Sequence, residues 1–156
     1  MGEDRRPVMV CATDLGGTAL ETIQAALSLA AQCACACLHV VHVRRQADRL
    51  KTAQEAADAI EHEEHRISEA VARADAHSIP VIPQLRTGEP CHEILAAVRE
   101  LHADYLVVGS HGHAGLDHFV SVAERVARRA PCNVVIVKPP SVSTRLSRDL
   151  DEWLER

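Results

Sequence analysis

The chain has 156 residues, a length that suits one domain with a sizeable hydrophobic core. Its formal net charge of −5, counted with neutral histidines, argues against a general nucleic-acid binder, because such a protein needs a basic surface. No apolar run approaches the ~20 residues of a membrane span, and the polar N-terminus is unlike a signal peptide. We therefore expect a cytoplasmic protein with no membrane or nucleic-acid partner.

The chain is expected to begin with a strand and a helix. Residues 7–13 are apolar and partly β-branched, which predicts a strand. A pair of glycines then turns the chain, and Thr18 followed by Glu21 has the spacing of a capping box. This pattern predicts a helix that runs to about Gln32, before a second strand over residues 35–43.

The middle of the chain is expected to form a long helix, an edge strand and a shorter helix. Over residues 46–77, apolar side chains recur at alternating steps of three and four, which predicts one long amphipathic helix. Glu64 falls in the gap of this apolar stripe, so we expect it to lie at the edge of the stripe or to pair with a cation. Residues 79–86 read as a strand in which two prolines favour an edge position. A proline-led helix is expected over residues 91–102.

The last part of the fold is expected to be a strand, a glycine-rich turn, a helix and a strand. Tyr105–Val108 is a short apolar strand that ends on Gly109. Ser121 is the expected N-cap of the following helix, and Pro131 ends that helix before a final strand, Asn133–Val137. A glycine-rich loop at the carboxyl end of a parallel strand leaves backbone N–H groups free, and α/β sheets bind phosphates at such places.

Strands and helices thus alternate along the chain. Runs of valine and isoleucine without polar alternation are typical of a parallel sheet that is covered on both faces. Crossovers between parallel strands are right-handed, so the alternation predicts an α/β fold with a doubly wound, five-stranded parallel sheet and helices on both faces.

Several ordered motifs resemble the universal stress protein family. They are VMVCATD at 8–14, LHVVHV at 38–43, TGEPCHEIL at 87–95, VVGSHGHAGL at 107–116 and SVAERVARRAPCNVVIVK at 121–138. The resemblance covers about residues 7–138 and implies that residues 1–138 form one universal stress protein domain. It also implies a Rossmann-like, adenine nucleotide alpha hydrolase-like sheet with strand order 3-2-1-4-5, and a role in the stress response.

Nucleotide-binding members of the family share a glycine pattern that this chain keeps only in part. The pattern is Gly, two residues, Gly, nine residues, Gly, then Ser or Thr, and Gly109 and Gly112 match its first half. Val122 and Ala123 stand where the second half requires glycine and a hydroxyl residue. When the chain is aligned on Ser121, it is two residues short and lacks the glycine that lets backbone approach the phosphates. Such a short loop would favour AMP or ADP over ATP.

By this resemblance, a set of ten residues would hold an adenine nucleotide, with Mg²⁺ as the only metal and only together with the nucleotide. The set is Ala12, Thr13, Asp14, Val40, Val108, Gly109, His111, Gly112, Ser121 and Val122. Asp14 either accepts hydrogen bonds from adenosine or caps the turn after the first strand. Val40 either touches the base or is an ordinary core valine. His111 would orient the loop backbone, and Ser121 would offer a helix N-terminus to a phosphate.

The absent glycine favours a second interpretation, a nucleotide-free dimeric interaction or stress-response protein. The resemblance implies a homodimer in either case, formed through the final strand Asn133–Val137, which contains no proline or charge that would block pairing.

A metal-binding protein or enzyme is the least favoured interpretation. The six cysteines include Cys33, Cys35 and Cys37, and with a strand start near residue 35 the last two would share a face with His39. Alternating residues of one strand rarely surround a metal, so we expect buried, reduced thiols. No nucleophile elbow or Walker A loop is present, and we expect no catalytic residue, with slow ATP hydrolysis as the most that the resemblance implies.

Residues 139–156 extend beyond the expected domain. Two prolines form a break, after which Ser143 or Ser147 is the expected start of a short helix. Its apolar stripe consists of Leu146, Leu150, Trp153 and Leu154. A helix this short needs something to pack against, so we expect it to dock on a partner subunit or across the domain surface, the alternative being a disordered tail.

Overall fold

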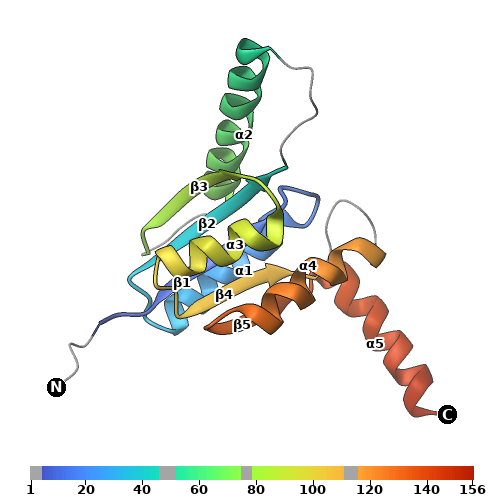
Figure 1. The fold of residues 1–156 in the computed structure, drawn as a ribbon. Coiled ribbons are helices and arrows are strands. Elements are labelled where there is room, and N and C mark those ends of the chain that lie inside the picture. Colours follow the sequence, from blue (N-terminus) through green and yellow to red (C-terminus); the bar gives the residue numbers. More distant parts are fainter. Residues whose placement is uncertain (1–4, 46–51, 75–78, 111–115) are drawn as a thin grey trace.

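The computed structural model describes residues 5–45, 52–74, 79–110 and 116–156. Its strands form one five-stranded parallel sheet in the order β3-β2-β1-β4-β5 (Figure 1), which confirms the predicted order and the doubly wound class. The elements are β1 (Val8–Thr13), α1 (Ala19–Gln32), β2 (Cys37–Arg44), α2 (Ala53–Arg73), β3 (Val81–Thr87), α3 (Pro90–Glu100), β4 (Tyr105–Gly109), α4 (Leu116–Arg129), β5 (Asn133–Val137) and α5 (Pro140–Leu154).

The sheet separates two hydrophobic cores. Successive side chains of a strand point to opposite faces, so Met9 and Cys11 of β1 join one core while Val10 and Ala12 join the other. The first core lies beneath α1 and α2, and the second lies beneath α3 and α4. Figure 1 shows α3 in front of the sheet and α1 behind it. Both faces of the sheet are therefore covered, as the unbroken apolar runs predict.

The two outer strands are β3 and β5, as predicted. β3 pairs with β2 through a register that includes Pro83, whose missing N–H is tolerated because the strand lies at an edge. β5 pairs with β4 on one side, and among the described residues its other side carries no strand. The open side of β5 is thus available for pairing.

A capping box marks the start of the helix α2. Thr52 has an extended backbone and caps the helix: its Oγ1 accepts from Glu55 N at 3.2 Å, and Glu55 Oε2 accepts from Thr52 N at 2.8 Å. The predicted continuous helix over residues 46–77 is therefore wrong at Thr52, where this capping box begins α2. The remainder of the predicted range, residues 46–51 and 75–77, lies outside the described residues. The expected capping box of α1 is also wrong, since Thr18 occupies the N-cap position but its side chain makes no capping hydrogen bond.

The inward face of α2 is narrow. Ile67 is the one fully buried residue among the described side chains of this 21-residue helix. Glu64 is exposed, which agrees with a place at the edge of the apolar stripe, whereas the neighbouring Glu63 is half-buried and turned toward His42 of the sheet. Within the described ranges, no helix has an apolar stretch long enough to cross a bilayer.

The C-terminal segment forms the helix α5. It begins at Pro140, not at Ser143 or Ser147, because proline at the first helical position has its φ angle already set for a helix. Only its start is buried, at Val142, whereas the exposed fraction of Trp153 is 66%. Figure 1 shows α5 extending away from the sheet, so docking across the surface of its own domain is not observed. Docking on a partner subunit remains a prediction.

Candidate functional site

The carboxyl ends of β1 and β4 lie side by side at the point where the strand order reverses. Ala12 of β1 is in register with Val41 of β2 on one side and with Val108 of β4 on the other. Asp14 and Gly109, which follow these positions, therefore lie at the same end of the sheet, as predicted. In open α/β sheets, ligands bind in the crevice outside the carboxyl ends of strands at such a reversal.

The loop after β1 is a tight, locally bonded turn. Thr13 Oγ1 accepts from Leu15 N at 3.1 Å, and Asp14 Oδ1 accepts from Gly16 N at 2.8 Å. Leu15 has a φ angle of 59°, in the left-handed region that costs a branched residue conformational energy. Asp14 thus caps the turn, which is one of its two predicted roles.

The exit of β4 is fixed to the neighbouring strand. Ser110 N donates to Val137 O at 2.9 Å, and Gly109 is in register with the same residue. Ser110 is buried, so the backbone leaves β4 in a defined direction. The next two predicted site residues, His111 and Gly112, lie outside the described residues.

The helix α4 starts earlier than the sequence predicts. It begins at Leu116, so Ser121 lies within the helix and the prediction that it is the N-cap is wrong. The prediction relied on the preference of serine for caps, but the helical periodicity already extends through the five residues before it. Any phosphate contact with the start of α4 would therefore use the backbone N–H groups of the turn that begins at Leu116, which have no partner within the helix.

The remaining predicted site residues line the interior. Ala12 and Val108 are buried in the core beneath α3 and α4, where β1 and β4 end. Val122 is half-buried against the core beneath α4. Val40 is fully buried in the core beneath α1 and α2, which agrees with the interpretation of an ordinary core valine.

Sequence reasoning missed a polar group that braces the loop after β1. His42, the last buried residue of β2, is in register with Thr13, and its Nδ1 lies 2.9 Å from Thr13 O. Its Nε2 lies 2.9 Å from Oε2 of Glu63 on α2. One turn further along α2, Arg66 donates to Leu15 O at 3.0 Å. The signal in the sequence was a histidine near the carboxyl end of a mostly apolar strand.

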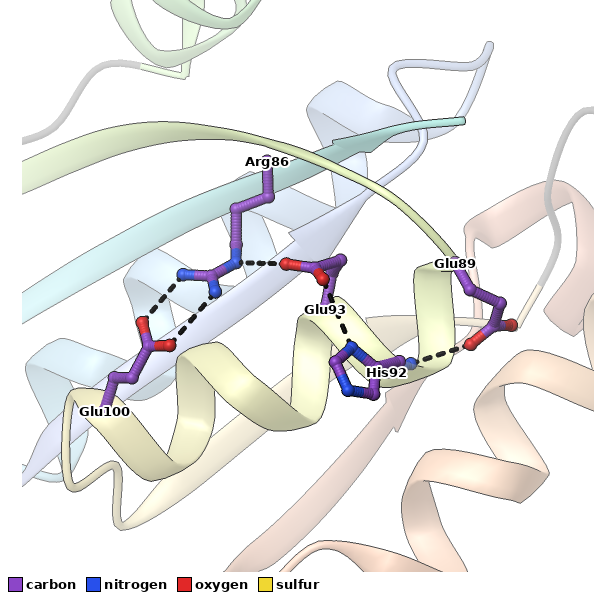
Figure 2. A network of polar contacts seen from close by, with 5 residues as sticks. All are labelled: Arg86, Glu89, His92, Glu93 and Glu100. Carbon is purple, nitrogen blue, oxygen red and sulfur yellow. Dashed lines mark hydrogen bonds and ion pairs between the residues drawn. The ribbon is translucent and has the colours of Figure 1, made fainter. Parts of the chain in front are cut away.

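A second polar network joins β3 to α3 (Figure 2). Arg86 Nε donates to Glu93 Oε2 at 3.0 Å, and its two terminal nitrogens donate to the carboxylate oxygens of Glu100 at 2.9 and 3.2 Å. The hydrogen bond from Arg86 holds the pKa of Glu93 below its usual range, and the same arginine lowers the pKa of Glu100. The fork of the guanidinium thereby ties the outer strand to the helix above it.

The start of α3 is capped and linked to α4. Glu89 is the N-cap, and its Oε2 accepts from His92 N at 2.8 Å (Figure 2), which is the first cause of its lowered pKa. Its other oxygen, Oε1, lies 3.1 Å from a terminal nitrogen of Arg125 on α4. One carboxylate therefore closes the helix end and fixes the two helices of this face to each other.

The histidine and cysteine side chains are mostly separated in the described structure. Cys37 Sγ lies 3.5 Å from His39 Nε2, but Cys35 lies before the start of β2 and does not share that strand face. Burial raises the pKa of Cys11 to about 12, so this thiol is a poor nucleophile. Among the described residues, no group of three or more histidine, cysteine or acidic side chains is placed to hold a metal ion.

Comparison with known proteins identifies relatives of most of the chain. The model of the universal stress protein family matches residues 6–138. The universal stress protein MJ0531 of Methanocaldococcus jannaschii is 35% identical over 69 residues, 43% of this chain and 41% of that protein. YxiE, a universal stress protein of Bacillus subtilis, is 42% identical over 53 residues, 33% of this chain and 36% of that protein. The aligned stretches thus span about two fifths of these two relatives.

Solved structures resemble the fold over most of its length. A universal stress protein crystallised in complex with cAMP has a TM-score of 0.67 and 25% identity, and the match covers 84% of this chain and 96% of that one. A universal stress protein family member from Burkholderia pseudomallei has a TM-score of 0.68 and 28% identity, and the match covers 87% of this chain and 98% of that one. Both neighbours agree with the sheet order described above.

Proposed function

Because the chain belongs to the universal stress protein family, we propose that it is a stress-response module that binds an adenine nucleotide at the carboxyl ends of β1 and β4. The observation that carries the proposal is the juxtaposition of the Asp14 loop and Gly109 at the reversal of the strand order. A solved relative, 25% identical to this chain, was crystallised in complex with cAMP, which supports a nucleotide of the AMP type.

The groups at this end of the sheet fit the parts of such a ligand. The carboxylate of Asp14 can accept hydrogen bonds from ribose hydroxyls or from the amino group of adenine. Because only 2% of the residues are aromatic, the base would be held mostly by backbone contacts and aliphatic side chains near the ends of β1 and β4. The first turn of α4, from Leu116, supplies N–H donors and the positive end of a helix dipole for a phosphate.

We propose that the preferred ligand is AMP or ADP and not ATP. The segment after Gly112 lacks the second-half glycine of the nucleotide pattern, and it is two residues shorter than that pattern when the chain is aligned on Ser121. A shorter loop offers fewer backbone donors to a chain of three phosphates. The N-terminus of one helix can still bind a single phosphate group.

Calorimetric titration with AMP, ADP and ATP tests this proposal. We expect AMP and ADP to bind more tightly than ATP. The Asp14→Asn variant keeps an oxygen to accept from Gly16 N but loses the charge, so it should bind AMP about 10-fold more weakly, as expected for losing a hydrogen bond to a charged group. The matched control is Asp58→Asn, which removes a charge from an exposed position on α2 and should leave the affinity unchanged.

Two results would overturn the proposal. One is the absence of both heat and a thermal shift with millimolar nucleotide. The other is an equal effect of the Asp14 and Asp58 substitutions, which would place the ligand elsewhere. The first result would leave the second interpretation, a nucleotide-free interaction protein, as the function to pursue.

We further propose that two copies associate through the open edge of β5. Ile136 on this strand is 43% exposed, and the strand holds no proline or charge that would oppose pairing. The exposed apolar residues of α5 follow directly in the chain, and a partner subunit would give them a surface to cover. They are Leu150, Trp153 and Leu154.

The two edges of the sheet allow a matched test of association. Ile82 on the other edge strand, β3, is 40% exposed, close to the value for Ile136. We expect light scattering to show a dimer for the unmodified protein and for Ile82→Lys, and a monomer for Ile136→Lys. A monomeric unmodified protein, or equal disruption by both substitutions, would refute pairing through β5.

A further inference from the structure

The helix α5 carries an apolar stripe that its own domain leaves largely exposed. The stripe consists of Leu146, which is half-buried, and of Leu150, Trp153 and Leu154, which are exposed. A short helix with its apolar side in water is only marginally stable. A cluster of exposed apolar side chains also marks a surface that binds a partner. The stripe therefore calls for a surface that can cover it.

A groove lies at the amino ends of three neighbouring strands, β5, β4 and β1. Its volume is about 500 Å³, and it lies at the end of the sheet opposite the proposed nucleotide site. Its wall is formed by the residue before β1, the first residue of β4 and the segment that joins α4 to β5, and includes Pro7, Tyr105, Ala130, Pro131, Cys132 and Asn133. The groove is thus open to a segment that approaches from beyond the amino ends.

Pairing through β5 would place this groove beside the α5 of a second copy. A two-fold axis that pairs a strand with its own copy makes the two strands antiparallel. When the pair is centred on Val135, Val137 lies opposite Asn133 of the partner subunit. Only Lys138 and Pro139 separate Val137 from the start of α5. Each α5 would therefore begin next to the amino end of the other copy's sheet.

The direction and the length of α5 fit the groove of the other copy. Figure 1 shows α5 leaving the sheet at the carboxyl end of β5 and extending beyond the β5 edge, away from β4. Neighbouring strands lie about 4.8 Å apart, so the amino ends of three strands span about 10 Å. At about 1.5 Å per residue, the stripe from Leu146 to Leu154 is about 12 Å long. The stripe is thus long enough to cross the groove.

The charges on α5 and around the groove are complementary. Residues 148–156 carry four carboxylates and two arginines. The last turn of α4, which leads into the groove wall, carries Arg128 and Arg129. A helix that binds a membrane surface has a polar face rich in lysine and arginine, and α5 has no such excess of positive charge. The charges therefore favour a protein surface as the cover.

The side chains of the groove suit a tryptophan. The indole ring is apolar, but its N–H needs a hydrogen-bond acceptor when it is buried. The groove offers both kinds of contact, because the side chains of Pro7 and Pro131 lie beside the carboxylate of Asp104 and the amide of Asn133. Trp153 therefore matches this mixed surface better than a purely aliphatic side chain would.

An interface made of β5 alone would be small. The strand has five residues, whereas a stable and specific interface buries about 800 Å² on each partner. A buried tryptophan alone contributes about 150–250 Å². Two copies of α5, each docked on the other subunit, would add this area twice.

We propose that α5 of each copy docks in the groove at the amino ends of β5, β4 and β1 of a second copy. The two contacts are equivalent and close the dimer symmetrically. The inference rests on the proposed association through β5 and adds the surface that receives α5. It does not depend on the nucleotide site, which lies at the other end of the sheet.

The single tyrosine and the single tryptophan of the chain give a direct test, because docking brings them together between copies. Tyr105 lies in the groove, and Trp153 lies on the stripe of α5. Within one copy they are far apart along the sheet, since Tyr105 begins β4 whereas α5 follows the carboxyl end of β5. Excitation of Tyr105 should therefore add to the emission of Trp153 in the dimer but not in a monomer.

Three proteins are compared at equal concentration by light scattering and fluorescence. In the unmodified protein, which we expect to be a dimer, Trp153 should emit at shorter wavelength than in the monomeric Ile136→Lys. Acrylamide should also quench it less in the unmodified protein. Tyr105→Phe should remain a dimer with a shielded Trp153, but it should lose the emission that tyrosine excitation adds.

A further variant measures what the stripe contributes to association. Leu150→Ser keeps Trp153 as a probe and removes one exposed apolar side chain from each α5. It should raise the dissociation constant of the dimer by about 10-fold, as expected when the burial of a leucine is lost. The matched control is Ile60→Ser, which removes an exposed apolar side chain from α2 and should leave the dissociation constant unchanged.

Each contrary result would overturn a different part of the inference. A dimer in which Trp153 is quenched as readily as in Ile136→Lys would refute the docking of α5 while pairing through β5 stands. A shielded Trp153 with equal energy transfer in the unmodified protein and Tyr105→Phe would refute the groove as the receiving surface. Equal dissociation constants for Leu150→Ser and Ile60→Ser would refute stabilisation by the stripe. A monomeric unmodified protein would refute both the association through β5 and this inference.

Discussion

Replacement of Arg86 by methionine tests how the outer strand β3 is held to α3. Methionine keeps the aliphatic stem but removes the guanidinium, which donates to Glu93 at 3.0 Å and to Glu100 at 2.9 and 3.2 Å. The side chains of Arg86 and Glu93 are only 21% and 19% exposed, so this ion pair is better shielded than a surface pair. Glu100 is exposed, so water screens its ion pair with Arg86.

The expected loss follows from the Arg86–Glu93 contact alone. Hydrogen bonds to charged groups contribute about 1.5–3 kcal/mol, and exposed ion pairs about 0.2–1 kcal/mol. With about a fifth of each side chain still in water, we expect Arg86→Met to lower the free energy of unfolding by about 1.5 kcal/mol. In a domain of this size the melting temperature should fall by about 3–6 °C.

The loss should also depend on pH in a defined direction. Arg86 lowers the folded-state pKa of Glu93, so the contact stabilises the fold fully above the ordinary carboxyl range. That contribution disappears as the pH falls through the lowered pKa. The difference between the unmodified protein and Arg86→Met should therefore be full at neutral pH and shrink below about pH 4.

Urea unfolding followed by far-ultraviolet circular dichroism measures both effects. Arg99→Met is the control, because it removes the same charge from an exposed position on α3. Arg99→Met should change the free energy of unfolding by no more than a few tenths of a kcal/mol, roughly the value for an exposed charge near a helix end. If the two variants lose equal stability, or if the loss in Arg86→Met is the same at acid and neutral pH, the reasoning is refuted.

Three further predictions concern the free energy of unfolding in urea, each for a separate physical reason. His39→Leu should raise the free energy of unfolding by about 1 kcal/mol, because the buried Nδ1 of His39 has no partner among the described residues. The gain should grow as the pH falls, since burial lowers the pKa of His39 in the folded state. No gain at pH 5 would contradict this prediction. Gly88→Ala should lower the free energy of unfolding by about 1–3 kcal/mol, because Gly88 has a φ of 150° and an added Cβ would lie 2.9 Å from Glu93 Cγ; a neutral result would show that the turn relaxes. Glu89→Ala should lower the free energy of unfolding by about 1 kcal/mol, because it removes the N-cap of α3. Arg125→Ala removes only the ion pair with Glu89 and should cost clearly less. Equal losses in the two variants would show that the ion pair, and not the cap, is responsible.

Most of the fold could be predicted because its signals are local. The apolar runs, the glycine turns and the proline that opens α3 place the strands and helices within a few residues of their observed bounds. Pro83 places β3 at an edge of the sheet, since a central strand needs every N–H. Helix starts were less predictable: Thr52 caps α2 and Leu116 begins α4, because competing caps and continued periodicity cannot be ranked from sequence preference alone.

The candidate site was predictable only along the strands that carry it. Asp14 and Gly109 could be placed at one end of the sheet because parallel strands with right-handed crossovers bring their carboxyl ends to the same side. The role of Val40 could not be decided from the chain, since one buried valine looks like another until its neighbours are known.

The sequence by itself determined the alternation of strands and helices, and with it the sheet and the edge at which a ligand would bind. Only the tertiary structure decided which polar residues support that edge. Glu63 and not Glu64 faces inward, and it meets His42, which lies 21 positions earlier in the chain. The physical reason is that the periodicity of a sequence shows only which side of its own helix or strand a residue lies on. A contact between two elements also depends on how they are rotated and shifted relative to each other, and the packing of the two cores sets that arrangement.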